Sequence, residues 1–215
     1  MLYLVVAVLF GFATAEPTRP GCCVPPQWEG IEGSIIGMVR DGVSSVTDTQ
    51  TLISYDETNQ MILANTYTEA AGQKINVKVL QDFNKGMQYV INVDQKTCTG
   101  TPMPGPFTKV CLPADAEVLG NIYFGIGDNR FDALSFRATV NNTRVTVVTT
   151  PEDCIPVLET LAGNFSGAPT MDTIGFVNLT PGIRDPAVFD VPSFCTQKKP
   201  TGFVKIHQKR GVLVF

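Results

Sequence analysis

Residues 134–150 read Leu-Ser-Phe-Arg-Ala-Thr-Val-Asn-Asn-Thr-Arg-Val-Thr-Val-Val-Thr-Thr. Apolar and polar side chains alternate from Leu134 to Val140, and β-branched residues dominate from Arg144 to Thr150. A period of two is typical of a strand with one buried face. The pair Asn141-Asn142 favours a tight turn between the two runs, because asparagine tolerates left-handed backbone. The stretch therefore predicts an antiparallel β-hairpin.

The same period recurs outward from this hairpin, at residues 74–79 and 87–93. Turn residues at 55–60, 84–86 and 127–130 separate neighbouring strands, which predicts a meander of antiparallel strands. Helix signal is weak. The best candidate is residues 151–161, which have acids in the first turn and Pro156 inside. Residues 100–113 carry four prolines and are expected to form a long loop.

The first fifteen residues are apolar, carry no charged side chain and end in Ala13-Thr14-Ala15. A short apolar run followed by two small residues spaced one apart is typical of a secretory signal peptide. The alternative is an N-terminal anchor that is never cleaved. We expect residues 16–215 to form a single domain, because no linker-like segment divides them and no later stretch is long and apolar enough to span a bilayer.

The net charge is −4 and no basic stripe runs along the chain, which argues against nucleic acid as the main partner. The one cationic cluster, Lys205, Lys209 and Arg210, is interpreted as a solvated tail.

Six cysteines behind a signal peptide indicate disulfides, and fifteen pairings are open. No paired C-x-x-C spacing indicates zinc. Three sequons, at Asn141, Asn164 and Asn178, predict N-glycosylation and agree with secretion.

An enzyme needs a nucleophile, a base or a metal. The single histidine, His207, is expected to be an exposed tail residue, and Ser54, Ser135, Ser166 and Ser193 lie in no nucleophile-elbow pattern. No pair of carboxylates stands out along the chain. The sequence therefore predicts a protein that is not an enzyme and needs no cofactor.

Four blocks of sequence resemble the ependymin-related family. They are Cys22 to Gly30 with its Trp-Glu-Gly triplet, Ser54-Tyr55-Asp56 followed by Asn59-Gln60, Asp153-Cys154 through Thr160 to the sequon at Asn164, and residues 182–195, Gly-Ile-Arg-Asp-Pro-Ala-Val-Phe-Asp-Val-Pro-Ser-Phe-Cys. The resemblance covers a core of about residues 22–195 and leaves 196–215 as a variable tail.

This resemblance implies a mostly β fold: two stacked, curved antiparallel sheets, similar to bacterial lipoprotein carriers, around an apolar pocket. It implies a secreted or lysosomal glycoprotein, usually a homodimer, that binds lipids, fatty-acid-like molecules or other amphiphiles and associates with calcium. An extracellular matrix or cell-adhesion glycoprotein without a lipid ligand is the alternative.

The resemblance also implies the pairings Cys22–Cys154 and Cys98–Cys195. Cys23 and Cys111 are then left either to pair with each other or to bond between molecules.

The sequence leaves two further roles open. Trp28 is interpreted as a structural anchor beside Cys22 rather than as a residue of the pocket mouth. Asp56, the Asp128-Asn129 loop and Asp185 before Pro186 could each supply calcium oxygens, although an ordinary turn explains each of them as well. Neither the ligand nor the calcium site is identified by residue.

Overall fold

The computed structural model describes residues 21–70, 73–103, 105–165 and 167–197. The expected signal peptide, Ser166, His207 and the cationic tail cluster lie outside the described residues. The strands are β1 (Gln27–Arg40), β2 (Val43–Asp56), β3 (Met61–Ala70), β4 (Gln73–Asp82), β5 (Met87–Asn92), β6 (Thr97–Pro102), β7 (Glu117–Ile126), β8 (Asn129–Val140), β9 (Thr143–Thr149), β10 (Pro156–Phe165), β11 (Ala168–Pro181) and β12 (Thr196–Gln197).

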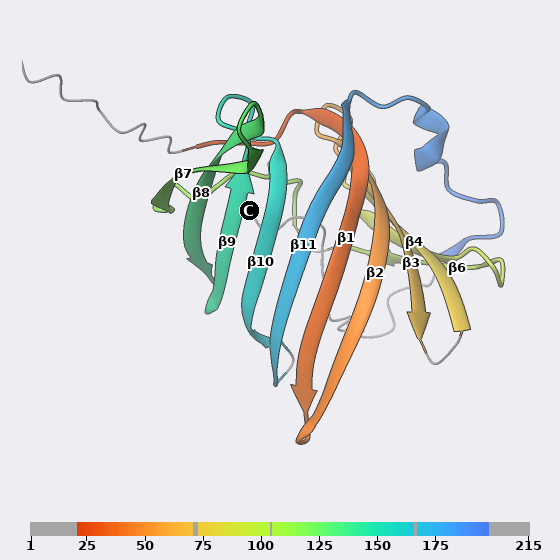
Figure 1. The fold of residues 1–215 in the computed structure, drawn as a ribbon. Helices are drawn as coiled ribbons and strands as arrows, with labels where there is room; N and C mark the ends of the chain where they lie inside the picture. Colours follow the sequence, from red (N-terminus) through yellow and green to blue (C-terminus); the bar gives the residue numbers. More distant parts are fainter. Residues whose placement is uncertain (1–20, 71–72, 104, 166, 198–215) are drawn as a thin grey trace, which may run out of the picture.

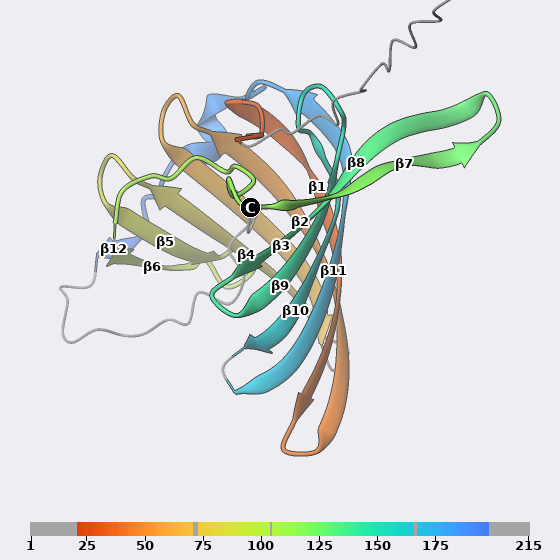
Figure 2. The same cartoon turned by 90° about the vertical axis from the view of Figure 1, so that its left-hand side faces the viewer.

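All twelve strands belong to one sheet, in the order β12-β6-β5-β4-β3-β2-β1-β11-β10-β9-β8-β7. Neighbours pair antiparallel except β12, which runs parallel to β6. The predicted mostly-β fold built from curved antiparallel strands is confirmed. The two expected layers prove to be halves of one continuous curved sheet (Figure 2), because the meander from β1 to β6 is never interrupted and long strands twist.

Three strands of fourteen residues, β1, β2 and β11, form the centre of the sheet. Alternation divides its side chains into two faces. We call the face that carries Trp28, Tyr55 and Phe136 the inner face. The opposite face, which carries Ile35 of β1 and Met171 of β11, is the outer face.

Two short segments cover the inner face, and we call them together the strap: residues 22–24 and 107–112. The strap is pinned by the disulfides Cys22–Cys154 and Cys23–Cys111. Its two segments also exchange backbone hydrogen bonds, from Val24 N to the Val110 carbonyl at 3.0 Å and from Leu112 N to the Cys22 carbonyl at 2.7 Å. Cys23–Cys111 therefore joins the two strap segments to each other, and Cys22–Cys154 ties the strap to the turn before β10.

The outer face of β3–β6 is covered by residues 183–195, which contain the one short helix of the described chain, η1 (Pro186–Phe189). Phe189 packs in a cluster with Leu63, Leu80 and Tyr89, and Cys195 is bonded to Cys98 of β6. In Figure 1 this segment lies beside the sheet, whereas β10, β11, β1 and β2 stand with nothing in front of them. Cys22–Cys154 and Cys98–Cys195 are the pairings that the family resemblance implies, and Cys23–Cys111 is one of the two alternatives left open for the remaining cysteines.

The strands β7 and β8 project from the body as a long hairpin (Figure 2), which we call the arm. Phe124 and Phe131 stack on it at 5.1 Å between ring centroids, and Arg130 lies 5.2 Å from the ring of Tyr123. Ile126 at its tip is 82% exposed.

The helix predicted at residues 151–161 is wrong. Residues 151–153 form a turn, and the chain then enters β10 at Pro156. Proline cannot donate an interior helical hydrogen bond, while Leu161 finds apolar partners on the inner face. The loop predicted at 100–113 is found from residue 103 onward, after the end of β6, and its later part is the strap.

Among the described residues, no helix is both long enough and apolar enough to cross a membrane.

Candidate functional site on the inner face

Two apolar clusters lie on the inner face beneath the strap. The first centres on Trp28, Tyr55 and Phe176, with Val110 of the strap packed into it. The second joins Phe136, Val145 and Leu161 to Leu112 of the strap. The strap therefore contacts both halves of the inner face.

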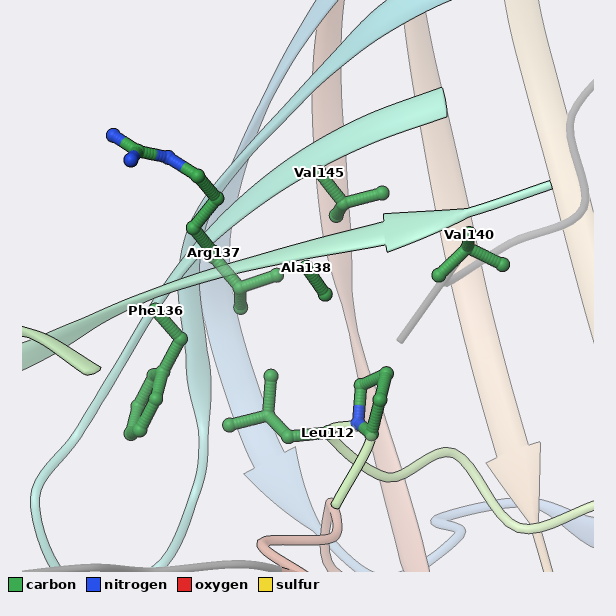
Figure 3. A pocket seen from close by; sticks show the side chains of 8 residues that line it. Leu112, Phe136, Arg137, Ala138, Val140 and Val145 are labelled. Atoms are coloured by element: carbon green, nitrogen blue, oxygen red, sulfur yellow. The ribbon is translucent and has the colours of Figure 1, made fainter. Parts of the chain in front are cut away.

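The second cluster surrounds a hollow between the strap and strands β8 and β9. Figure 3 shows Leu112, Phe136, Ala138 and Val145 around it, with the side chain of Arg137 directed away. The hollow has an empty volume of about 210 Å³ but is too narrow to admit a water-sized sphere. Binding a long apolar chain here requires the strap to move away from β8 and β9.

A second, open cleft of about 580 Å³ lies along β2, β3 and β4. Most of the residues that line it are polar, including Asp48, Gln50, Tyr67 and Asp94, although more of its lining surface is apolar than polar. The cleft is open to solvent, whereas the strap-covered region gathers two buried apolar clusters, so we take the strap-covered region as the better candidate for an apolar ligand.

Between the two apolar clusters, three carboxyl groups lie on the inner face of adjacent strands: Glu32 on β1, Asp172 on β11 and Glu159 on β10. The register places Glu32 opposite Phe176, and Asp172 opposite both Ile36 and Leu161. Glu159 stands opposite Ile174, which packs against both apolar clusters. We call Glu32, Asp172 and Glu159 the carboxyl cluster.

The carboxyl cluster is buried and electrostatically coupled. Glu159 is 0% exposed and Asp172 is 2% exposed, while Glu32 is only half-buried. Burial, together with the charges of Glu32 and Asp172, raises the pKa of Glu159 to about 8. Burial and the charge of Asp172 raise the pKa of Glu32 to about 7. At neutral pH this part of the inner face therefore holds protons that ordinary glutamates release.

Several buried polar atoms near this cluster have no hydrogen-bond partner. Both carboxyl oxygens of Glu159, Oε1 of Glu32 and Oγ1 of Thr149 are among them. Trp28 Nε1, farther along the inner face of β1, is another. Buried polar groups are normally satisfied, and a local concentration of exceptions indicates that something polar completes the site.

Trp28 is 2% exposed, and its ring lies 6.0 Å from that of Tyr55. It is a core residue of the first apolar cluster, which agrees with the structural-anchor interpretation. The three sequon asparagines, Asn141, Asn164 and Asn178, are all exposed and therefore accessible to glycosylation.

The candidate calcium acids lie in separate turns, and hydrogen bonds within the turn hold two of them. Asp56 accepts from Asn59 N at 2.8 Å, and Asp185 accepts from Ala187 N at 3.0 Å. Asp128 lies in the turn of the arm. Within the described ranges, no three His, Cys, Asp or Glu side chains are arranged to hold a metal ion.

Of the serines examined as possible nucleophiles, Ser54 and Ser135 lie in the sheet. Ser54 donates to Glu29 at 3.2 Å, Ser135 is buried on β8, and Ser193 is an exposed loop residue.

Sequence reasoning missed the carboxyl cluster because its members are far apart in the chain. One signal was present: in Leu158-Glu159-Thr160-Leu161, Glu159 has the same alternation phase as Leu161. An acid in the buried phase of a strand departs from the usual pattern of apolar-in and polar-out.

Comparison with known proteins supports the assignment made from the four sequence blocks. The sequence profile of the Ependymin family matches residues 71–195. Ependymin-related protein 1 of Haliotis asinina is 30% identical over 185 residues, covering 81% of this chain and 90% of that protein. Mammalian ependymin-related protein 1 of Rattus norvegicus is 27% identical over 197 residues, covering 88% and 83%.

Among solved structures, an uncharacterized conserved protein from Thermus thermophilus shares the fold. Its TM-score is 0.50 at 7% identity, and the match covers 80% of this chain and 90% of that one.

Proposed function

This chain belongs to the ependymin family, and from that premise we propose that it is a secreted, disulfide-bonded glycoprotein that carries a lipid or another amphiphile against the inner face of its sheet. The observation that carries the proposal is the composition of the inner face. Two apolar clusters flank buried polar atoms that lack partners. The apolar chain of an amphiphile would pack against the two clusters, and its polar head would bind the polar atoms that lack partners.

The energetics favour reversible carriage. Burying a sixteen-carbon chain releases roughly 12 kcal/mol at about 0.8 kcal/mol per methylene. Association opposes this with roughly 4–15 kcal/mol. Displacing the strap adds a further cost, so affinity is modest and increases with the length of the apolar chain.

Lipid extraction tests the proposal directly. The protein is purified from its secreting cells without detergent, extracted, and the extract is analysed by mass spectrometry. We expect copurifying amphiphile near one molecule per chain and displacement of a bound, uncharged fluorescent lipid. Repeated absence of both would overturn the carrier.

A variant locates the binding region. Ala138→Phe adds bulk at the hollow shown in Figure 3, whereas Thr139→Phe adds it on the exposed side of the same strand. We expect the first change to reduce ligand binding and the second to leave it unchanged. Equal binding by both variants would place the ligand elsewhere.

The second candidate function is an extracellular interaction glycoprotein, favoured by exposed apolar side chains on the arm and on the outer face. Tyr123 is 58% exposed, Ile126 is 82% exposed and Phe131 is 44% exposed. Protein without copurifying lipid, whose binding to matrix is lost when these arm residues are made polar, would favour this function.

A homodimer is part of the proposal, and we place its interface on the outer face of β2, β1 and β11. Val46, Ile35 and Met171 are 72%, 59% and 56% exposed there. Gly33 and Gly175 pair across β1 and β11 on this face and, having no side chains, leave the surface between them flat. Flat exposed apolar surface of this kind marks interaction sites.

Delivery to lysosomes through the glycans at the exposed sequons is proposed as a second destination. Uptake of the glycosylated protein by cells, compared with enzymatically deglycosylated protein, tests it. Calcium has no assigned site in this proposal, because the described candidate acids lie in separate turns.

A further inference from the structure

We infer that the carboxyl cluster of Glu32, Asp172 and Glu159 is a binding site for the head of a cationic amphiphile, a long-chain organic ammonium. The inference rests on the proposed function and specifies which kind of head the inner face selects. Anionic fatty-acid heads are disfavoured at the same place.

The first argument is burial without partners. Glu159 is 0% exposed, yet neither of its carboxyl oxygens forms a hydrogen bond. Oε1 of Glu32 is also buried without a hydrogen-bond partner. When the two glutamates are ionised these three atoms are acceptors only, so a partner that binds the ionised form has to donate hydrogen bonds. An ammonium group carries up to three N–H donors and a positive charge.

The second argument is charge. Beyond the effect of burial, the charge of Asp172 raises the pKa of Glu32, and the charges of Glu32 and Asp172 raise the pKa of Glu159. In the described part of the chain, neither glutamate forms a salt bridge with a lysine or an arginine. A carboxylate or phosphate head would add like charge to this region, whereas a cation would relieve the repulsion.

The third argument is the apolar surface on both sides of the carboxyl cluster. Ile174 stands opposite Glu159 and packs against both apolar clusters, so an apolar chain attached to the head finds apolar surface on either side. Glu32 is only half-buried, so it is the most exposed member of the carboxyl cluster. A bare metal ion is a poorer candidate, because no three acids in the described ranges have the spacing of metal ligands.

Binding must also release protons. The glutamates are partly protonated near neutral pH in the free protein, and a cation beside them favours the ionised forms. Each ammonium that binds therefore displaces protons from Glu32 and Glu159 into solvent. This readout separates ion pairing from simple burial of an apolar chain.

The test compares three probes with one apolar chain: dodecylamine, dodecanoic acid and dodecanol, titrated into the full secreted chain at pH 7. We expect dodecylamine to bind about tenfold or more tightly than dodecanoic acid, and to release protons that a pH indicator detects. Glu159→Gln and Glu32→Gln should each weaken dodecylamine binding by about tenfold and leave dodecanol binding unchanged. Glu117→Gln, an exposed acid on the arm, is the matched control.

The outcomes are distinguishable. Equal binding of dodecylamine and dodecanoic acid would overturn the inference, and so would unchanged dodecylamine binding in both glutamine variants. In either case, binding of dodecanol would still support the proposal that the protein carries amphiphiles. Failure of all three probes to bind overturns the carrier and the inference together. If Glu159→Gln does not fold, the half-buried position 32 still decides the question.

Discussion

Ser34 Oγ donates a hydrogen bond of 2.5 Å to Asp172 Oδ1, joining β1 to β11 on the inner face. The contact is diagonal, because Ser34 is opposite Ile174 and Asp172 is opposite Ile36. A buried carboxylate that accepts a short, charge-assisted hydrogen bond is stabilised in its ionised form. Ser34 therefore holds the carboxyl group of Asp172 in place between β1 and β11.

Replacing this serine should destabilise the fold. Ser34→Ala removes this donor to the buried Asp172, which we expect to lower the free energy of unfolding by about 0.5–1.5 kcal/mol. Urea denaturation followed by circular dichroism measures the change. Ser45→Ala, an exposed serine on β2, is the control and should change stability by less than about 0.5 kcal/mol. Equal effects of the two changes would refute the role of the contact.

The carboxyl cluster predicts that the protein is less stable in alkali than in mild acid. In the unfolded chain both glutamates titrate near 4.5, whereas in the fold the pKa is about 7 for Glu32 and about 8 for Glu159. Between these values the folded state binds more protons than the unfolded state, so the free energy of unfolding falls as pH rises from about 4.5 to about 8.

We expect this loss to be on the order of a few kcal/mol and to be smaller in Glu159→Gln. Urea denaturation at pH 5 and at pH 8 measures it in both proteins. If the free energy of unfolding of the wild-type protein stays constant or rises between pH 5 and pH 8, the two glutamates do not have the raised pKa values on which this prediction depends.

The turn between β2 and β3 depends on Asp56. Burial alone would raise the pKa of Asp56, but hydrogen bonds from Asn59 and Gln27 outweigh burial and lower it below 3.8. The donors include Asn59 N at 2.8 Å, Asn59 Nδ2 at 2.7 Å and Gln27 Nε2 at 2.9 Å. This contribution to stability is complete above pH 3.8 and is lost as pH falls through the lower, folded-state pKa.

Asp56→Ala should therefore lower the free energy of unfolding at pH 6 by about 1–3 kcal/mol and remove part of the acid-induced loss. Thermal unfolding at pH 6 and at pH 3 measures both effects. Asp128→Ala, in the exposed turn of the arm, is the matched control. A variant that keeps the full acid sensitivity of the wild type would assign that sensitivity to other carboxylates.

Local chemistry explains which parts of the fold could be predicted from sequence. Alternation from Leu134 to Val140 and the Asn141-Asn142 turn define β8, β9 and their hairpin, and both asparagines have positive φ. The mistaken helix at residues 151–161 shows the limit. Acids at its start resemble a helical first turn, but Glu159 and Leu161 belong to one face of a strand.

The strap and the carboxyl cluster depend on contacts between residues distant in sequence. Cys22 and Cys154 are 132 positions apart, and Ser34 and Asp172 are 138 apart. Only the register of β1 on β11 brings the latter pair together, and alternation within one strand does not determine that register. The site therefore required the structure: alternation did not predict β1 or β11, and β10 was expected to be part of a helix.

The outer face predicts where a dimer forms. If β2, β1 and β11 are the interface, then Ile35→Lys or Met171→Lys places an unpaired charge within it. Each change should weaken dimerisation by about a hundredfold or more, because a buried charge without a partner costs several kcal/mol. Sedimentation equilibrium across a range of concentrations measures the dissociation constant.

Ile126→Lys, at the exposed tip of the arm, is the matched control, since it adds the same charge to an equally apolar surface. We expect it to leave the dimer intact, because β7 is an edge strand of the sheet and does not pair with β2, β1 or β11. Dissociation by Ile126→Lys but not by Ile35→Lys would transfer the interface to the arm. A wild-type chain that remains monomeric at every concentration would refute the dimer itself.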